Sequence, residues 1–430
     1  MSNTHISKSI YQLDITPPQF LGSLDQNIQC DIGIIGGGLT GISTALSLVE
    51  KGYQVSLFEA GNIGDGGSGR NGGQICQGWS TSFNKLCKYI DPDCQQDMWQ
   101  AGIEGPSLIK DRIDKYKIEC DAHWGYVHTA IHKGHMRELD EYQQEFESHG
   151  YDLLTSLADK SSLFNYICSD AYIGGLYDAG SGHLHPLKYL IGLAKAASKL
   201  GAHIYTNSPI TEINVANNNN KLISDNGHTI SAERLIICGN AYLGAVAPRN
   251  LRSRIAPVTS SVMATDPLSD NEIAQTIPSN AAIADGNTAL NYFRIDSQKR
   301  LIFGGRASYL NTDPLNVETD LRKRMKAVFP DLMHKKIQQA WSGRIGITAN
   351  RLPDFGRVSD TAIYVQGYSG HGVAFSGVAG SILGDAIIDK QDRFNQLIKI
   401  SHIPFPGGPF RAPILAIGMG WYKMKDYLQI

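Results

Sequence analysis

The stretch of residues 31–59 restricts the fold of this chain more than any other part of the sequence. A short apolar run, 31–35, is followed by Gly36, Gly38 and Gly41, which are spaced as Gly-x-Gly-x-x-Gly. Between a strand and a helix, such a turn is typical of dinucleotide binding. Its glycines permit the tight turn, the approach of the backbone to a diphosphate, and close packing of helix on strand. We expect the diphosphate at the start of the helix, against free N–H groups and the positive end of the helix dipole.

The residues after the glycine turn extend this unit to a second strand. Apolar residues recur with helical spacing over 39–49, and Gly52 is a natural end for the helix. Residues 53–58 predict a strand, and Glu59 ends it, eighteen residues after Gly41. An acid at this place hydrogen-bonds ribose hydroxyls and disfavours a 2′-phosphate.

The bulk properties of the chain limit the kinds of partner that it binds. With 430 residues it is long enough for two intertwined domains, and its 39 basic and 41 acidic side chains nearly cancel to a net charge of −2. A nucleic-acid partner needs a basic surface, so none is expected. The N-terminus lacks the apolar core of a secretion signal, and the apolar stretch 412–422 is too short to cross a membrane. We therefore expect a cytoplasmic protein without a transmembrane segment.

Cysteines and histidines give no sign of a metal site. The seven cysteines contain no Cys-x-x-Cys pair, and their odd number argues against a disulfide framework. His183 and His185 lie two residues apart with no further ligand nearby. We expect no bound metal.

The rest of the sequence alternates between helix and strand patterns. Predicted helices occupy the polar stretch 83–150 and residues 186–200 and 373–389, and predicted strands occupy 203–206, 234–238 and 362–366. Residues 255–310 hold alternating segments with a hairpin-like turn at 296–299, which indicates an antiparallel sheet.

This order predicts a fold that combines the α/β and α+β classes. We expect a Rossmann-like cofactor domain built from discontinuous segments, with an antiparallel-sheet substrate domain inserted between them. The expected boundaries are an N-terminal extension at 1–27, a cofactor domain at 28–82, 151–250 and 335–400, a substrate domain at 83–150 and 251–334, and a C-terminal tail at 401–430 that packs on the core.

A second glycine turn, 369–372, lies just before the last predicted helix and has the sequence Ser-Gly-His-Gly. A nicotinamide-binding chain would continue after Glu59 with further strand–helix repeats, but here a glycine-rich run at 64–74 follows almost at once. N–H groups at the start of the last helix suit the pyrimidine edge of an isoalloxazine ring, where negative charge develops on reduction. The two turns together favour FAD.

Several segments resemble the D-amino-acid-oxidase-like flavoprotein superfamily, which includes sarcosine, glycine and dimethylglycine oxidases. They resemble its γ-glutamylputrescine oxidoreductase branch still more closely. The resemblance rests on the first glycine unit and on GGSGRNGGQ (66–74), GHLHPLKYL (182–190), WSGRIGITANRLPDFGR (341–357), QGYSGHGV (366–373) and the late PFPGG and WYKMKDYL. It covers nearly the whole chain from residue 28, and it implies the GR2/DAO type of FAD-binding domain.

The resemblance also implies which residues hold the flavin. Arg70 to Gln74 would line its reactive ring, Ile210 would meet the adenine end, Gly239 would lie by the diphosphate, and Ser369 to Val373 would cap the pyrimidine end. For Arg70 a solvated loop arginine and for Gln74 a packing role remain open. The predicted cofactor-binding residues are Gly36, Gly38, Leu39, Thr40, Gly41, Glu59, Ala60, Ser68, Arg70, Asn71, Gly72, Gly73, Gln74, Ile210, Gly239, Ser369, Gly370, His371, Gly372 and Val373.

The chain departs from its relatives in ways that bear on cofactor and substrate. Positions that form a covalent flavin bond in some relatives are Ile345 and Asn71 here, so non-covalent FAD is implied. The arginine that clamps a substrate carboxylate in amino-acid oxidases falls one position early, at Arg344, and so turns to the opposite face of an extended segment. A lysine of sarcosine oxidases is replaced by Ala374. A substrate whose reacting carbon carries no carboxylate is therefore expected.

We expect hydride transfer from a carbon bearing nitrogen to the flavin, giving an imine that hydrolyses to an aldehyde, with oxygen as acceptor and hydrogen peroxide as product. An apolar, aromatic pocket would favour the neutral amine by desolvation. The candidate pocket residues are Tyr292, Arg306, Trp341, Tyr368 and His371. His371 would either stabilise reduced flavin or brace its loop, Tyr292 and Trp341 would be core aromatics or substrate contacts, and Arg306 would bind a distal carboxylate or a surface acid.

Two other functions fit the sequence. One is the oxidation of a different secondary amine or amino acid, with electrons passed to a carrier. The other is a flavin-binding partner protein without turnover. The sequence leaves the oligomeric state open.

Overall fold

In the computed structural model, which describes residues 7–216, 219–287, 290–308 and 316–406, the expected strand–turn–helix–strand unit is present. β1 (Ile28–Ile35) leads into α2 (Leu39–Val49), and β2 (Val55–Phe58) pairs with β1 in parallel. Every residue of α2 is buried. The prediction for this segment is confirmed.

β1 is a central strand of the first sheet. Within the described residues, that sheet also contains β7 (His203–Tyr205), β8 (Ile210–Ala216), β9 (Asn219–Ser224), β10 (Thr229–Ile237), β16 (Asp354–Ser359) and β17 (Ala362–Gln366). The order is β16–β17–β10–β1–β2–β7, with β9 and then β8 attached to β10. The strands from β17 to β7 are parallel, as in a Rossmann sheet, so their carboxyl ends meet at one edge.

The second sheet is mostly antiparallel. Its strands in the described residues are β3 (Gln74–Ile75), β4 (His123–Ala130), β5 (Thr155–Asp159), β6 (Gly174–His183), β11 (Ile255–Pro267), β12 (Ala282–Asp285), β13 (Tyr292–Ile295), β14 (Arg300–Ser308) and β15 (Ile337–Thr348). The order is β15–β11–β14–β13–β12–β4–β6–β3, with β5 on β6. The predicted hairpin turn at 296–299 joins β13 to β14, whereas β12 and β4 pair in parallel.

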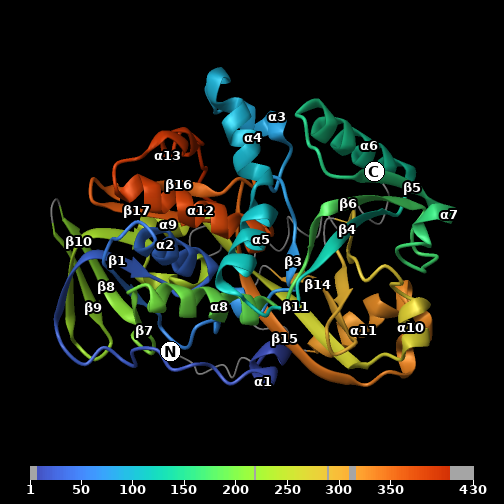
Figure 1. Ribbon diagram of the computed structural model, residues 1–430, viewed down its shortest axis with the longest axis horizontal. Coiled ribbons are helices and arrows are strands. Elements are labelled where there is room, and N and C mark those ends of the chain that lie inside the picture. Colours follow the sequence, from blue (N-terminus) through green and yellow to red (C-terminus); the bar gives the residue numbers. More distant parts are fainter. Residues whose placement is uncertain (1–6, 217–218, 288–289, 309–315, 407–430) are drawn as a thin grey trace.

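The helices cover both sheets (Figure 1). α8 (Pro186–Lys199) and α12 (Gly372–Ile387) pack on either side of α2. α5 (Gly105–Tyr116) lies against α12, and α1 (Ile10–Asp14) contacts α8 and β15 between the two halves of the molecule. The remaining helices are α3 (Phe83–Cys87), α4 (Gln95–Ile103), α6 (Lys133–Ser148), α7 (Lys160–Leu163), α9 (Arg249–Arg254), α10 (Asp270–Ala274), α11 (Val317–Val328) and α13 (Asp392–Leu397).

Two details of the sequence interpretation change. The helical prediction for residues 83–150 is wrong at β4, which pairs with β6 and β12, strands that lie far away along the chain. In addition, β3, β5, β6 and β15 come from segments placed in the cofactor domain but lie in the second sheet. The domain boundaries proposed from the sequence cut across that sheet.

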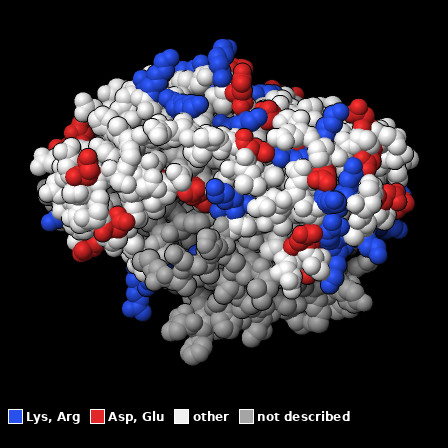
Figure 2. Space-filling model, turned by 90° about the horizontal axis from the view of Figure 1, so that it is seen from below, with Lys and Arg blue, Asp and Glu red and all other residues white. Residues whose placement is uncertain are grey.

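Charged side chains of both signs lie on the surface of the molecule. On the face shown in Figure 2, acidic and basic side chains lie close to one another over much of the surface, as the net charge of −2 suggests. Among the described residues, no helix has both the length and the apolarity that a membrane span requires. Most of the predicted C-terminal tail, residues 407–430, is outside the described residues.

Candidate active site

The first glycine turn is shaped by close backbone contacts. Gly36 has a φ of +104°, in the region that favours glycine. A Cβ added to Gly36 would lie 3.1 Å from the Cys238 carbonyl and 3.2 Å from the Gly239 nitrogen. A Cβ added to Gly41 would lie 1.9 Å from the Gly36 carbonyl oxygen. The first and third glycines are therefore required by packing, and Gly239 lies directly beside the turn.

The second glycine of the motif lies at the start of α2. Gly38 is the N-cap of α2 and offers no side-chain cap. Ser68, from the short 3₁₀ turn Gly67–Gly69, accepts a hydrogen bond from the Leu39 N–H through Oγ at 3.0 Å. An oxygen atom is therefore held at the helix N-terminus, where a phosphate oxygen of a dinucleotide would also be favoured.

Glu59 lies at the carboxyl end of β2, beside the same turn. Its carboxylate accepts hydrogen bonds from the Gly37 N–H at 2.6 Å and the Gly61 N–H at 3.0 Å. Burial raises the pKa of Glu59, because the charged form loses water. The Ser208 N–H donates to the Glu59 carbonyl at 2.9 Å, and β8 begins two residues later, at Ile210. The residues predicted for the adenine and ribose end thus lie in one region.

The second glycine turn lies next to the first. After β17 the chain passes through Ser369 (φ +52°) and Gly370 (φ +111°), and α12 begins with His371 as its N-cap. The Tyr368 hydroxyl and Thr40 Oγ1 are 2.7 Å apart and form a buried hydrogen bond. The N-termini of α2 and α12 therefore share the edge at which the parallel strands end, as the sequence predicts.

The glycine loop, residues 64–74, connects this edge to the second sheet. Asn71 shapes it from within: its Nδ2 donates to the Gly67 and Ser68 carbonyls at 3.1 and 2.9 Å, and its Oδ1 accepts from the Gly73 N–H at 2.8 Å. Gln74, in β3, donates to the Ile283 carbonyl at 2.8 Å and accepts from the Tyr126 hydroxyl at 3.0 Å. Arg70 is buried and bonds backbone carbonyls, so it is not a solvated loop arginine.

Aromatic side chains surround the start of α12. A small pocket there is lined by Gly78, Trp79, Ser80, Pro353, Tyr368, His371 and Phe375. Burial lowers the pKa of His371 to about 4, with a further contribution from His128. Its Nδ1 has no hydrogen-bond partner among the described residues. His371 is therefore neutral at neutral pH, and its Nδ1 is a buried polar atom without a partner among the described residues.

A wall of residues from and beside the second sheet, Cys76, Tyr126, His128 and Tyr292, lies on the side of His128, which acts on His371. Cys76, His128 and Tyr292 each keep part of their surface accessible, yet loss of water dominates their pKa values. It raises the pKa of Cys76 to about 11 and that of Tyr292 to about 12, and it lowers the pKa of His128 to about 4. Tyr126 and Tyr292 pack in one cluster with Cys76. This wall is uncharged and aromatic.

The predicted pocket residues differ in their surroundings. Tyr292 lies against Gly72 and Gly304, and its hydroxyl is 3.1 Å from Ser260 Oγ. Trp341 is 1% exposed and donates from Nε1 to the Arg70 carbonyl at 2.9 Å, so it packs behind the glycine loop as a core aromatic. Arg306 lies in β14, and its side chain is outside the described part of the chain.

The sequence interpretation missed part of this wall. His128 and Tyr126 were not singled out, because they reach the site only through the pairing of β4 with β6 and β12. Cys76 follows β3 and was considered only as one of the seven cysteines. Trp79 and Phe375 were missed as well, although the position of Phe375 four residues after His371 on one helix face was a usable signal.

Comparison with known proteins identifies the family. The family model described as "FAD dependent oxidoreductase" (DAO) matches residues 31–386 of the chain. The chain belongs to the DAO family of FAD-dependent oxidoreductases. It is 34% identical over 409 residues to gamma-glutamylputrescine oxidoreductase of Escherichia coli K12, which covers 95% of both chains. It is 35% identical over 410 residues to the probable oxidoreductase OrdL of Haemophilus influenzae, which covers 94% of this chain and 93% of that one.

Solved structures of DAO-type enzymes have the same fold. L-proline dehydrogenase from P. horikoshii superposes with a TM-score of 0.71 at 18% identity, over 86% of this chain and 96% of that chain. Glycine oxidase from Geobacillus kaustophilus gives a TM-score of 0.69 at 19% identity, over 84% and 95% of the two chains. The predicted fold class is confirmed, and the chain is an FAD-dependent oxidoreductase of this family.

The residues of the first glycine turn fit the FAD that the family uses. The turn brings backbone without side chains to a helix N-terminus, and Glu59 lies beside it with a carboxylate suited to ribose hydroxyls. At the other end, the unpartnered Nδ1 of His371 and the N-terminus of α12 supply polar groups in an otherwise aromatic setting. Both ends of the expected cofactor thus have groups of suitable chemistry.

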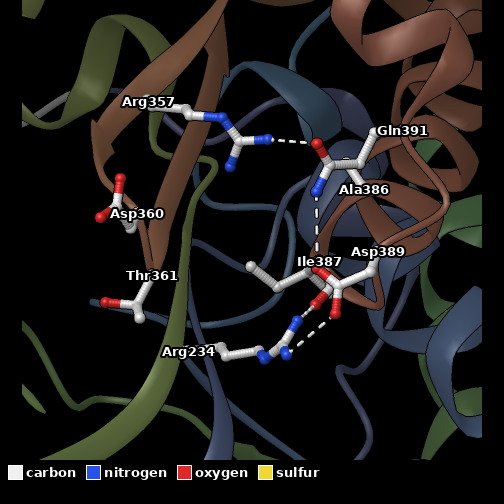
Figure 3. Close-up of a pocket in the computed structure, with 8 residues that line it drawn as sticks. All are labelled: Arg234, Arg357, Asp360, Thr361, Ala386, Ile387, Asp389 and Gln391. Carbon is white, nitrogen blue, oxygen red and sulfur yellow. Dashed lines mark hydrogen bonds and ion pairs between the residues drawn. The ribbon is translucent and has the colours of Figure 1, made fainter. Parts of the chain in front are cut away.

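A second pocket, shown in Figure 3, lies elsewhere. It has a volume of about 100 Å³ and is lined by Arg234, Arg357, Asp360, Thr361, Ala386, Ile387, Asp389 and Gln391. These residues come from β10, β16, the turn before β17 and the carboxyl end of α12, which is roughly 22 Å along that helix from His371. Dinucleotides bind at the carboxyl ends of the strands, so this pocket is not the cofactor site. Its arginines pair with Gln391 and Asp389.

Histidines 183 and 185 are structural. His183 donates from Nε2 to the Asn280 carbonyl at 2.9 Å, and His185 caps α8 by accepting from the Lys188 N–H at 3.2 Å. Within the described residues, no three His, Cys, Asp or Glu side chains converge as metal ligands.

Proposed function

We propose that this chain is an FAD-dependent amine oxidase whose substrate is γ-glutamylputrescine, which would place it in putrescine catabolism. The observation that carries the proposal is the match over nearly the whole length to gamma-glutamylputrescine oxidoreductase of E. coli. Bound FAD would accept a hydride from the carbon next to the substrate nitrogen. Loss of the nitrogen proton would leave an imine, which water would convert to an aldehyde and an amine or ammonia. Oxygen would then take up the two electrons, with two protons, and leave as hydrogen peroxide.

The predicted cofactor residues remain part of this proposal. Gly36 to Gly41 and Gly239 would surround the diphosphate, Glu59 and Ala60 the ribose, and Ile210 the adenine. Ser68 and the glycine loop would continue towards the ring, with Ser369 to Val373 at its pyrimidine edge. The arrangement of these segments along one edge of the first sheet supports the assignment.

Non-covalent FAD is also proposed. Ile345 has no nucleophilic atom, and the Asn71 amide is engaged within the glycine loop. After acid denaturation and filtration of the yellow protein, we expect all the flavin in the filtrate. Flavin that stays with the protein would contradict this.

The surroundings of the site favour an amine without a carboxylate on the reacting carbon. β15 is regularly paired from Trp341 to Ile345, so the Arg344 side chain projects from the face opposite to Trp341. Ala374 is 2% exposed and packs against Gly105 of α5. Neither position supplies a cation on the side of the glycine loop.

The uncharged wall also affects the protonation of the substrate. A protonated amine has no lone pair to assist hydride loss, so the site must favour the neutral form. Tyr292, His128 and His371 are uncharged at neutral pH, because burial shifts the pKa of each away from neutrality. An ammonium group entering this space loses water without gaining a counter-ion, and this favours release of its proton. The neutral His371 Nδ1 is placed to accept a hydrogen bond there.

The decisive experiment is anaerobic reduction of the bound flavin, which is monitored through the loss of its visible absorbance. We expect γ-glutamylputrescine to bleach the flavin much faster than putrescine, sarcosine, glycine, D-alanine or L-proline at equal concentration. Readmitted air should then restore the colour and give one peroxide for each substrate consumed. Fastest bleaching by an α-amino acid would refute the substrate, and bleaching without peroxide would refute oxygen as acceptor. Flavin that every amine leaves oxidised would favour a binding protein without turnover.

The cytoplasmic location expected from the sequence stays a prediction.

A further inference from the structure

The sequence of the glycine loop does not fix its own shape. Six of the ten residues from 64 to 73 are glycines, which lose more conformational freedom on folding than any other residue. The internal hydrogen bonds of Asn71 order only part of the loop. Contacts from elsewhere in the chain must therefore hold it in one conformation.

The N-terminal segment, residues 7–14, supplies such contacts. Ser9 Oγ donates to the Gly69 carbonyl at 2.9 Å, and Gln12 Nε2 donates to Asp65 Oδ1 at 2.7 Å. Arg70 Nη1 donates to the Ser7 carbonyl at 2.8 Å. The segment starts α1 with a capping box on Ser9, which is fully buried. Residues that the sequence interpretation left as an extension are thus bonded directly to the glycine loop.

Arg294 joins α1 to the other end of the loop. Its Nε donates to the Gly72 carbonyl at 2.7 Å, and its Nη2 donates to the Tyr11 hydroxyl at 3.2 Å. A Cβ added to Gly73 would lie 2.9 Å from Nη2. The loop backbone therefore rests directly on the guanidinium group.

The charge of Arg294 is buried and forms no ion pair with an acid of the described residues. Arg294 is 2% exposed, and no carboxylate of the described residues lies within ion-pairing distance. Asp296, two residues along the chain, pairs with Arg300 instead, at 2.7 Å. A buried charge without a counter-ion is costly, so folds rarely keep one without a use for it.

The neighbouring histidines do not change this balance. Burial lowers the pKa of His183 to about 3 and that of His185 to about 4, and Arg294 lowers both further. Both imidazoles are neutral at neutral pH. The two imidazoles therefore add no charge of their own beside the guanidinium group.

We propose that Arg294, held by the Tyr11 hydroxyl, is a positioning residue of the cofactor site that fixes the glycine loop and places a buried positive charge without an ion-pair partner behind it. The inference rests on the proposed placement of the flavin ring along residues 70–74. A positive charge behind the loop favours a cofactor that gains negative charge on reduction. Arg294 thus has two effects, on FAD affinity through the loop and on the reduction potential through its charge.

The experiment compares Arg294→Met and Arg294→Lys with the parent holoenzyme. Apoprotein is titrated with FAD by fluorescence, and the two-electron midpoint potential is measured at FAD saturation. In Arg294→Met we expect a rise in the Kd for FAD of tenfold or more. We also expect a tenfold shift of the reduction equilibrium towards oxidised flavin, or about 30 mV. In Arg294→Lys we expect weaker FAD binding but the parent potential, because the charge remains while the two hydrogen bonds cannot both form.

The matched control is Arg112→Met. Arg112 is a similarly buried arginine, 5% exposed, that bonds Ser43 from α5 and does not contact the glycine loop. This variant should lose thermal stability without a change of potential. A merely structural role of Arg294 predicts the same result for Arg294→Met, and an unchanged potential there overturns the proposal.

Tyr11→Phe keeps the test possible if Arg294→Met does not fold. This variant removes one buried hydroxyl, and we expect the Kd for FAD to rise roughly threefold to tenfold. A parent-like Kd overturns the role of Tyr11. These measurements use no amine. An enzyme that binds FAD but is not reduced by γ-glutamylputrescine would therefore refute the proposed substrate without contradicting the role of Arg294. A parent protein that binds no FAD refutes the proposed function itself.

Discussion

At the scale of single residues, Gly38 shows how little space the proposed diphosphate site allows. A Cβ added to it would lie 2.9 Å from Ser68 Oγ, directly over the first N–H groups of α2. We expect Gly38→Val to weaken FAD binding by tenfold or more, because the branched side chain would occupy the place of a phosphate oxygen. The ratio of flavin to protein absorbance after gel filtration measures the effect.

A matched glycine provides the control for this change. No atom lies within 4 Å of a Cβ added to Gly22, so Gly22→Val should retain its flavin. Gly38→Val should keep the circular dichroism of the parent. If both variants stay equally yellow, the diphosphate is not at the start of α2.

His183 links a single imidazole to the stability of the protein. Burial keeps its pKa at about 3, whereas an exposed histidine has a pKa of about 6.5. Between these pH values the unfolded chain binds the proton and the folded chain does not, so the free energy of unfolding falls as the pH is lowered. Between pH 7 and pH 5, the free energy of unfolding should fall by about 1–2 kcal/mol less in His183→Gln than in the parent protein. Urea unfolding at the two pH values tests this, and equal losses would contradict a neutral His183.

At the scale of elements, the contact between α2 and α12 sets the geometry of the site. Gly380 is the point of closest approach: an added Cβ would lie 2.7 Å from Ser43 Cβ and 2.8 Å from the Thr44 nitrogen, both in α2. This contact brings the two helix N-termini together, where Tyr368 bonds Thr40. A larger residue has to push the helices apart.

We expect Gly380→Ala to lower the free energy of unfolding by about 1–3 kcal/mol, although alanine is the better helix former by about 1 kcal/mol. Gly384→Ala is the control one turn later, since its nearest neighbour is the Ser47 hydroxyl at 3.1 Å, an atom that can rotate away. Thermal or urea unfolding of both variants measures the difference in the free energy of unfolding. A Gly380→Ala protein as stable as the parent would mean that α12 has room to shift.

The elements that the sequence predicted well carry local signals of their own. The first glycine turn, the strand 362–366 and the helix after His371 are bounded by glycines and by a change of periodicity, and each was located to within two residues. β4 lacks such signals. Its residues read as part of a polar helical stretch until β6 and β12 pair with it.

At the scale of the whole molecule, the arrangement of the two sheets separates what the sequence predicts from what it does not. The positions of Gly36, Glu59 and His371 were predictable because each lies within a short motif, and their roles in cofactor binding stay predictions. His128 and Tyr126 were not predictable, because they lie in β4, whose partners β6 and β12 are far away along the chain. Arg294 was not, because its contacts with Gly72 and Tyr11 join distant parts of the chain. The segment around Tyr11 was missed for the same reason, since its value lies in contacts with residues 65–72 and 294.

The hydrogen bond between Thr40 and Tyr368 has a consequence for how the protein is made. The two residues are 328 positions apart. At typical ribosomal speeds of roughly 5–20 residues per second, the later one is added roughly 15–65 s after the earlier one. The first glycine turn is therefore synthesised well before α12, the helix that completes the site. We therefore expect flavin loading at the end of translation or after it, and we expect chains that terminate early not to acquire the cofactor.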